Sequence, residues 1–204
     1  MNSNFSRNPV LLIHGIFRKS GIFYKMSAYL TQLGWLVYTL NLSPHWGNAS
    51  IDELAQQIAD YIDKTLAPEQ HLDIVGLSMG GLVTRYYLQK RLGGINRVQR
   101  FIAISSPHSG TWMAYTLWGK GCIQMRPGSA FLEDLNREAA LLEKLNFTSI
   151  WTDWDFIIVP ASSSQISAAK EVKLSVFAHV MMARHSSSLK AVAEALSEPL
   201  KINN

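Results

Sequence analysis

Apolar runs rich in β-branched residues alternate with amphipathic stretches along almost the whole chain of 204 residues. This alternation is typical of a parallel sheet whose strands are joined by helices on both faces. We therefore expect one α/β domain over residues 1–204, built on a small, mostly parallel sheet of six strands. The apolar runs place these strands at Val10–Ile13, Trp35–Leu40, Leu72–Gly76, Val98–Ser105, Phe147–Trp151 and Val172–Phe177.

Helical periodicity fills most of the stretches between these runs. Ser50 and Glu53 form the two ends of a capping box, a pattern that opens a helix. Gly34 ends an earlier helix, because glycine readily takes the left-handed conformation that follows a last helical turn. The predicted helices are Ile22–Leu33, one that begins after Ser50, one that runs from the end of the third strand to about Leu92, and Ser187–Leu196.

The most informative motif lies where the third strand meets the third helix. There the apolar run leads without a loop through Gly76-Leu77-Ser78-Met79-Gly80 into the helical pattern. A Gly-x-Ser-x-Gly sequence between a strand and a helix is the context of a nucleophile elbow. The glycines permit a tight turn that holds the serine hydroxyl above the sheet, and the helix N-terminus behind it favours negative charge. Ser78 is thus a predicted nucleophile; the alternative is a Gly-rich turn with a helix-capping serine.

Composition and charge limit the classes of partner. Lys and Arg number 19 against 15 Asp and Glu, which gives a formal net charge of +4 without a basic block. We therefore expect no nucleic-acid partner, although weak, transient attraction to anionic membrane surfaces is compatible with this charge. No cluster of residues has the spacing of metal ligands, so we expect neither a metal nor another cofactor. We favour a monomer.

Cysteine content and hydropathy bear on the location of the protein. Cys122 is the only cysteine, so no internal disulfide can form. The polar stretch Met1–Pro9 is followed by an apolar run that is too short for a signal peptide. No segment approaches the roughly 20 apolar residues of a membrane span. These features predict a cytoplasmic protein.

A serine nucleophile needs a histidine base, which is in turn oriented by a carboxylate. Asp155 follows the fifth predicted strand and precedes an apolar run, so its carboxylate can lie in a dry site; Asp153 is the alternative. His179 comes directly after the sixth predicted strand, whose rigid end would fix an imidazole well. His185, beside the serines that precede the last helix, is the alternative base.

Backbone N–H groups must stabilise the oxyanion that forms when a serine attacks a carbonyl. One such group is expected from Met79, the residue after the nucleophile. The other is expected from the turn after the first strand, where the small Gly15 lets the backbone approach. Ile16 N–H is our choice there, with Phe17 next, whereas His14 reads as a structural hydrogen-bonding residue.

Four segments, in order, resemble the small bacterial lipases and esterases of the α/β-hydrolase superfamily, in particular the minimal lipases without a large cap. His14-Gly15-Ile16 resembles their oxyanion motif, and Leu72–Val75 with Ser78–Gly81 resembles their elbow. The remaining two resemblances are to the acid segment, at Thr148–Trp151 with Asp155 and Ile157, and to the base segment, at His179 with Ser186, Val192 and Leu196.

This resemblance implies an α/β-hydrolase fold and hydrolysis of small-molecule or lipid esters through an acyl-enzyme, with Ser78, His179 and Asp155 as the triad. It also implies an oxyanion hole made by Ile16 and Met79. An acyltransferase or thioesterase with the same triad is the alternative, because sequence does not distinguish water from another acceptor. A non-catalytic binding relative is a third interpretation.

Residues 107–130 depart from the minimal lipases, since they are longer and more aromatic. We expect a lid-like insertion there, followed by a helix that begins after Ser129 and runs to about Leu145. Trp112, Tyr115 and Trp118 recur at three-residue spacing; they would line an acyl pocket, belong to a mobile lid, or pack as core. His108 lies in a segment that borders the active site of larger lipase-like proteins, where it would contact substrate without being catalytic.

Overall fold

The computed structural model describes residues 7–90 and 93–201, and within them six strands form one sheet. The strand order is β2-β1-β3-β4-β5-β6 and every neighbouring pair is parallel, which confirms the predicted sheet. The strands are β1 (Val10–Ile13), β2 (Val37–Leu40), β3 (Leu72–Leu77), β4 (Val98–Ile104), β5 (Asn146–Trp151) and β6 (Lys170–Lys173).

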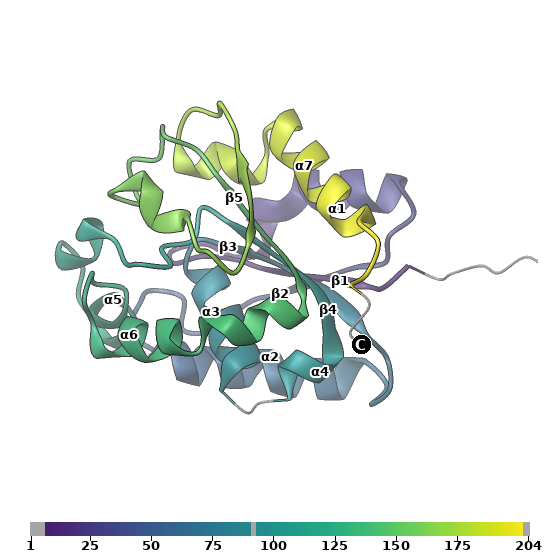
Figure 1. The fold of residues 1–204 in the computed structure, drawn as a ribbon, viewed down its shortest axis with the longest axis horizontal. Helices are drawn as coiled ribbons and strands as arrows, with labels where there is room; N and C mark the ends of the chain where they lie inside the picture. The colour runs from purple at the N-terminus through teal and green to yellow at the C-terminus, as the bar shows by residue number, and fades with distance from the viewer. Residues whose placement is uncertain (1–6, 91–92, 202–204) are drawn as a thin grey trace, which may run out of the picture.

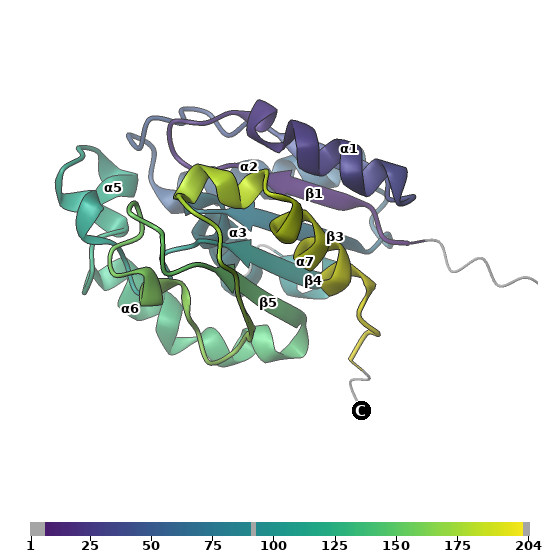
Figure 2. The same cartoon turned by 90° about the horizontal axis from the view of Figure 1, so that it is seen from above.

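Helices cover both faces of the sheet, as expected from the alternating pattern. In Figures 1 and 2, α1 and α7 lie together on one face, whereas α2 and α3 lie on the other. The α-helices are α1 (Tyr24–Gln32), α2 (Ile51–Thr65), α3 (Met79–Gln89), α4 (Gly94–Arg97), α5 (Lys120–Gln124), α6 (Ala130–Arg137) and α7 (Ser186–Ser197). The 3-10 helices are η1 (Ser20–Phe23), η2 (Trp112–Tyr115), η3 (Ala139–Lys144), η4 (Ala161–Ser164) and η5 (His179–Ala183).

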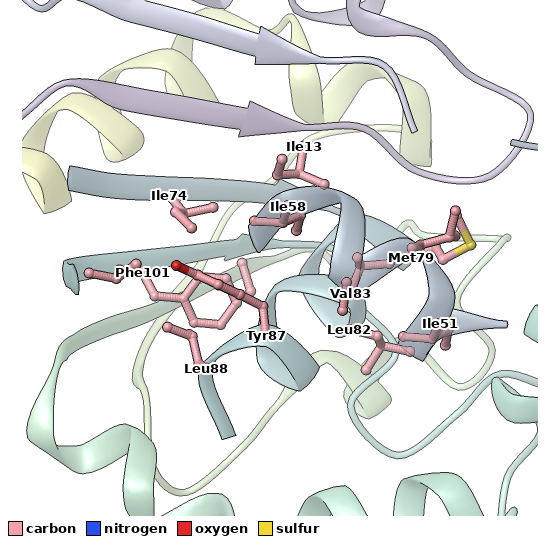
Figure 3. Close-up of a cluster of buried hydrophobic side chains, with 14 of the residues drawn as sticks. Ile13, Ile51, Ile58, Ile74, Met79, Leu82, Val83, Tyr87, Leu88 and Phe101 are labelled. Atoms are coloured by element: carbon pink, nitrogen blue, oxygen red, sulfur yellow. The ribbon is translucent and has the colours of Figure 1, made fainter. Parts of the chain in front are cut away.

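The sheet divides the core into two layers because successive side chains of a strand point to opposite faces. On β1, Leu11 and Ile13 pack toward α2 and α3, while Val10 and Leu12 pack toward α1 and α7. Both faces of the central strands are therefore buried, which explains why they read as continuous apolar runs. Figure 3 shows the first layer, where Ile58 of α2 and Val83 of α3 lie beside Ile13 and other side chains of the sheet.

The sixth strand is shorter and lies earlier than the predicted Val172–Phe177. Its register with β5 ends at the pair Trp151 and Lys173, and one further hydrogen bond joins Leu174 N–H to Trp151 O at 2.8 Å. β5 ends there, so residues 174–177 have no strand to pair with. Val176 is nevertheless buried in the layer under α7. The prediction of a strand to Phe177 was therefore wrong about sheet pairing, and of the last two residues of the apolar run only Val176 is buried, whereas Phe177 is exposed.

Two helix ends and one connection between strands also differ from expectation. The helix that Ser129 caps ends at Arg137, and η3 follows after Glu138 instead of a continuous helix to Leu145. α3 ends at Gln89, and the predicted end near Leu92 lies outside the described residues. The connection from β5 to β6 contains only the short η4. Among the helices that the structure describes, none has the length and apolarity needed to cross a membrane.

Candidate active site

Ser78 occupies the turn between β3 and α3, at the carboxyl edge of the sheet. Its backbone has φ 56° and ψ −125°, a conformation that residues with a side chain rarely adopt. The turn is held from the neighbouring strand, because Ser78 N–H donates to Ile104 O at 2.8 Å. Strain of this kind persists only where the surroundings impose it, and it is frequent at functional sites.

Glycines are required around this turn because backbone segments approach one another closely. A Cβ on Gly76 would lie 2.8 Å from the backbone of Gly80, where α3 passes over the end of β3. A Cβ on Gly15 would lie 2.9 Å from Ser78 Cβ, so the loop after β1 contacts the elbow directly. The glycines of the predicted motif therefore have a steric role that the sequence pattern indicated.

Asp155 and His179 form a hydrogen-bonded pair beside the elbow. The distance from His179 Nδ1 to Asp155 Oδ2 is 2.7 Å, and both side chains are largely buried. Asp155 lies in the loop after β5, and His179 begins η5. A carboxylate accepts hydrogen bonds, so Nδ1 carries the proton and Nε2 is left as an acceptor.

The second oxygen of Asp155 is fixed by its own loop. Oδ1 accepts hydrogen bonds from Ile157 N–H at 3.0 Å and from Ile158 N–H at 2.9 Å. Burial alone would raise the pKa of this carboxyl, but the hydrogen bond and charge of His179 and the two N–H groups outweigh it. The pKa of Asp155 is therefore lowered from its ordinary value of 3.8, and the group is a carboxylate at neutral pH.

The two alternative residues have other partners. Asp153 lies on the surface, and its Oδ2 is 2.6 Å from Lys173 Nζ. His185 precedes α7 and is exposed; its Nδ1 accepts a hydrogen bond from Ser187 N–H at 3.3 Å and so caps that helix. Neither side chain contacts the Asp155–His179 pair in the recorded hydrogen bonds and ion pairs of the described residues.

The loop after β1 is positioned by His14, as expected for a structural histidine. His14 Nδ1 lies 2.8 Å from Gly15 O, and His14 Nε2 accepts a hydrogen bond from Leu42 N–H at 2.9 Å. Burial lowers the pKa of this imidazole, which keeps it in the neutral form that these two contacts require. Phe17 N–H donates to His45 O at 2.7 Å and is therefore occupied. Within residues 7–90 and 93–201, Ile16 N–H donates a hydrogen bond to no protein acceptor.

Ser78 and His179 line the same small cavity, which has a volume of about 140 Å³. Gly15 and Ile16 line it from the β1 loop, and Ile157 lines it from the loop of Asp155. The other lining residues are Phe17, Arg18, Ile22, Leu77 and Val180, of which only Phe17 was a candidate site residue from the sequence. The cavity thus combines a mostly apolar wall with the predicted nucleophile and base.

Residues 107–130 contribute none of the residues that line this cavity. Trp112, Tyr115 and Trp118 are at least half exposed, so the interpretation of this stripe as core is wrong. Whether the segment moves as a lid stays a prediction.

His108 is buried, contrary to a role in contacting substrate. Its ring packs edge-on against Phe147, and its Nδ1 lies 3.5 Å from an Nη atom of Arg85, which is also buried. Burial lowers the pKa of Arg85 to about 9, and burial together with the Arg85 charge lowers the pKa of His108. Sequence analysis could not find this pair, because an arginine within a helix is usually a surface residue.

The described residues contain no group of three or more His, Cys, Asp or Glu side chains arranged to hold a metal ion.

Solved structures with the same fold include two lipases and an enol-lactonase. Lipase B of Aspergillus fumigatus superposes with a TM-score of 0.81 at 22% identity, over 98% of this chain and 56% of the fungal chain. Lipase BlEst2 of Bacillus licheniformis in its mature form gives 0.77 at 12% identity, over 97% and 95%. The enol-lactonase of Burkholderia xenovorans LB400 gives 0.70 at 15% identity, over 97% and 94%.

These similarities concern the fold, since all three identities lie below 25%. The chain spans little more than half the length of the fungal lipase. The family model described as the alpha/beta hydrolase fold matches residues 8–120, which is more than half of the 204 residues. The six-stranded parallel sheet, the strained serine turn and this match together establish that the chain belongs to the alpha/beta hydrolase family.

Proposed function

We propose that this alpha/beta hydrolase cleaves carboxylic esters through an acyl-enzyme formed on Ser78. The observation that carries the proposal is the Asp155–His179 hydrogen bond of 2.7 Å beside a cavity that Ser78 and His179 both line. A serine hydroxyl becomes a nucleophile when a histidine beside it accepts its proton and a carboxylate holds that histidine in position.

In the first half of the reaction, Ser78 Oγ attacks the ester carbonyl and His179 Nε2 accepts the hydroxyl proton. Asp155 holds the imidazole in the tautomer that leaves Nε2 as an acceptor and stabilises the imidazolium that forms. Ile16 and Met79 N–H donate to the oxyanion of the tetrahedral intermediate, each worth about 10²–10³ in rate. Collapse of this intermediate releases the alcohol, which takes the proton from His179.

In the second half, water attacks the acyl-enzyme. His179 accepts a proton from the water and returns it to Ser78 as the acid leaves, so the enzyme is regenerated without a cofactor. If a thiol ester replaces the ester, or an alcohol replaces the water, the same groups support a thioesterase or acyltransferase reaction. Addition of methanol to the assay and analysis of the products for methyl ester distinguish transfer from hydrolysis.

The cavity supports an apolar acyl group as substrate. Its wall is made mostly of Ile, Leu, Val and Phe side chains, and its volume of about 140 Å³ is small. Sites for drug-sized ligands usually measure about 300–1,000 Å³. We therefore expect water-soluble esters with short acyl chains to react fastest, and longer chains of lipid esters to extend beyond the cavity.

Hydrolysis of a chromogenic ester series with acyl chains from two to twelve carbons tests this function. We expect turnover by the wild type and a fall by a factor of about 10³ or more in Ser78→Ala and His179→Ala. His185→Ala is the matched histidine control, because this side chain caps α7, and its activity should stay within about threefold of the wild type. A folded wild type that hydrolyses no ester, or an active Ser78→Ala variant, would contradict the proposal and favour a binding role.

A further inference from the structure

Six tryptophan and phenylalanine side chains of the described residues are more than half exposed to solvent. Trp118 is 89% exposed, Phe177 is 67% exposed and Trp112 is 58% exposed. We call the set the aromatic rim; each member is more than half exposed, and its members are Trp46, Trp112, Trp118, Trp154, Phe156 and Phe177.

All members of the rim lie on connections that leave the carboxyl edge of the parallel sheet. These are the connections after β2, β4, β5 and β6, which lie at the end of the molecule marked by α5 in Figures 1 and 2. The exposed large apolar side chains at the opposite edge of the described structure are aliphatic, namely Leu33, Leu36 and Leu200. Exposed aromatic surface is therefore concentrated on the side of the molecule that carries Ser78.

Backbone contacts join the segments of the rim to one another. Gly121 N–H donates to Gly47 O at 3.0 Å, which holds the loop of Trp46 against the start of α5. Trp112 N–H donates to Val159 O at 2.9 Å, which links η2 to the loop of Phe156. The rings of Phe156 and Phe177 then pack with their centroids 5.8 Å apart. The rim is thus a connected surface rather than a set of scattered side chains.

This surface flanks the mouth of the cavity on two sides. Phe17, which lines the cavity, packs against Trp46 with ring centroids 5.8 Å apart. Ile157 lines the cavity from the loop that also carries Phe156. A partner that covers the rim therefore faces the cavity that contains Ser78.

Two carboxylates at this edge are paired with lysine, and two cations beside the rim are not paired with a carboxylate of the described residues. Asp153 is paired with Lys173 at 2.6 Å, and Glu53 is paired with Lys120 at 3.2 Å. Arg18 and Lys19 are exposed beside the rim, and the recorded ion pairs of the described residues do not include either of them. Such a surface is electrostatically complementary to an anionic one.

We infer that the aromatic rim docks the protein onto lipid surfaces that carry anionic headgroups, with the cavity mouth facing the lipid. Tryptophan favours the boundary between headgroups and acyl chains, because its ring is apolar and its N–H is polar. Nearby lysine and arginine add attraction to anionic lipid. The inference rests on the proposed function, because it names the source from which an ester would enter the site.

Vesicle flotation tests the docking without reference to catalysis. The probes are vesicles of phosphatidylcholine alone and of phosphatidylcholine with 30% phosphatidylglycerol, at low and high NaCl. We expect the wild type to float with the anionic vesicles and to be released at high salt. The variant Trp112→Ser/Trp118→Ser should bind at least about tenfold more weakly, because two large apolar side chains are lost. Leu33→Ser/Leu36→Ser, at the opposite edge, should bind like the wild type.

Turnover of a water-soluble short ester, measured on the same proteins, separates failure of docking from failure of the proposed function. The Trp112→Ser/Trp118→Ser variant should keep this turnover, which also shows that it is folded, and should lose turnover of an ester embedded in vesicles. Equal flotation of this variant and the wild type would overturn the inference. A wild type that floats with neither kind of vesicle would also overturn it. So would a wild type that forms a dimer in solution with the rim buried between the two copies.

Discussion

Asp155 shows how one side chain can fix two parts of a site. Oδ2 contacts His179 Nδ1, and Oδ1 accepts hydrogen bonds from the N–H groups of Ile157 and Ile158. The same carboxylate therefore orients the His179 imidazole and fixes the conformation of its own loop. The reason for preferring Asp155 over Asp153 was the apolar run that follows it, but in the structure only Ile158 of that run is buried, whereas Phe156, Ile157 and Val159 are exposed. The buried position of the carboxylate and its two backbone donors both depend on how the loop folds, which the sequence pattern did not indicate.

The preference for His179 rested on a reason that the structure corrects. His179 does not follow directly after a strand, since β6 ends at Lys173. Its position depends instead on the turn before it, where Ala178 has φ 71° and its N–H donates to Trp154 O at 3.2 Å. This bond joins the segment of His179 to the loop of Asp155. A contact between two loops leaves no periodic trace in the sequence, so pattern analysis could not have found it.

Replacement of Asp155 by Asn tests the charge of this side chain at constant size. We expect kcat for ester hydrolysis to fall by about 10⁴, because an amide favours the wrong imidazole tautomer.

The lowered pKa of Asp155 also predicts a change in stability with pH. The stabilisation is fully present above the ordinary value of 3.8 and is lost as the pH falls through the lower pKa of the folded state.

Urea unfolding of the wild type and Asp155→Asn at pH 7 and at about pH 3 measures this effect. The difference in free energy of unfolding between the two proteins should be smaller at the acidic pH. A difference that is constant or larger there would show that the carboxylate is not stabilised in the folded state.

At the scale of elements, the site depends on where the ends of three elements meet. β3 delivers Ser78, α3 begins at Met79, and the loop after β1 lies against both. The sequence predicted β1, β3 and the start of α3 closely, because buried strands and the Gly-x-Ser-x-Gly turn have strong local signals. It placed β6 and the end of the Ser129 helix less well, because burial without sheet pairing and a switch to 3-10 geometry depend on tertiary contacts.

Gly15→Ala tests the contact between the β1 loop and the elbow. The added methyl group would lie 2.9 Å from Ser78 Cβ, so the loop must shift and displace Ile16 N–H. We expect kcat to fall by about 10²–10³, the usual effect of losing one oxyanion donor. Gly21→Ala is the matched control, because its Cβ would meet no atom within 4 Å, and it should retain wild-type activity. Equal kinetics for the two variants would argue against Ile16 as an oxyanion donor.

In the whole molecule, the parallel arrangement of the strands places the candidate site residues at the carboxyl edge of the sheet. The carboxyl ends of β1, β3 and β5 lead into the loop of Ile16, the turn of Ser78 and the loop of Asp155, and His179 lies in the chain after β6. Ligands of open α/β sheets generally bind at this edge. The aromatic rim lies there as well, so Ser78, the cavity and the exposed aromatic surface lie on the same side of the molecule. The sequence contained the aromatic stripe but not its exposure, which depends on how the β4–β5 connection packs.

The central claim is that Ser78 is an activated nucleophile, and covalent labelling tests it most directly. We would incubate the wild type, Ser78→Ala and His179→Ala with a fluorophosphonate and locate the adduct by mass spectrometry. The account predicts one adduct per chain, on Ser78, with no labelling of Ser78→Ala and much slower labelling of His179→Ala. A folded wild type that remains unlabelled, or an adduct on a different serine with Ser78 unmodified, would contradict it.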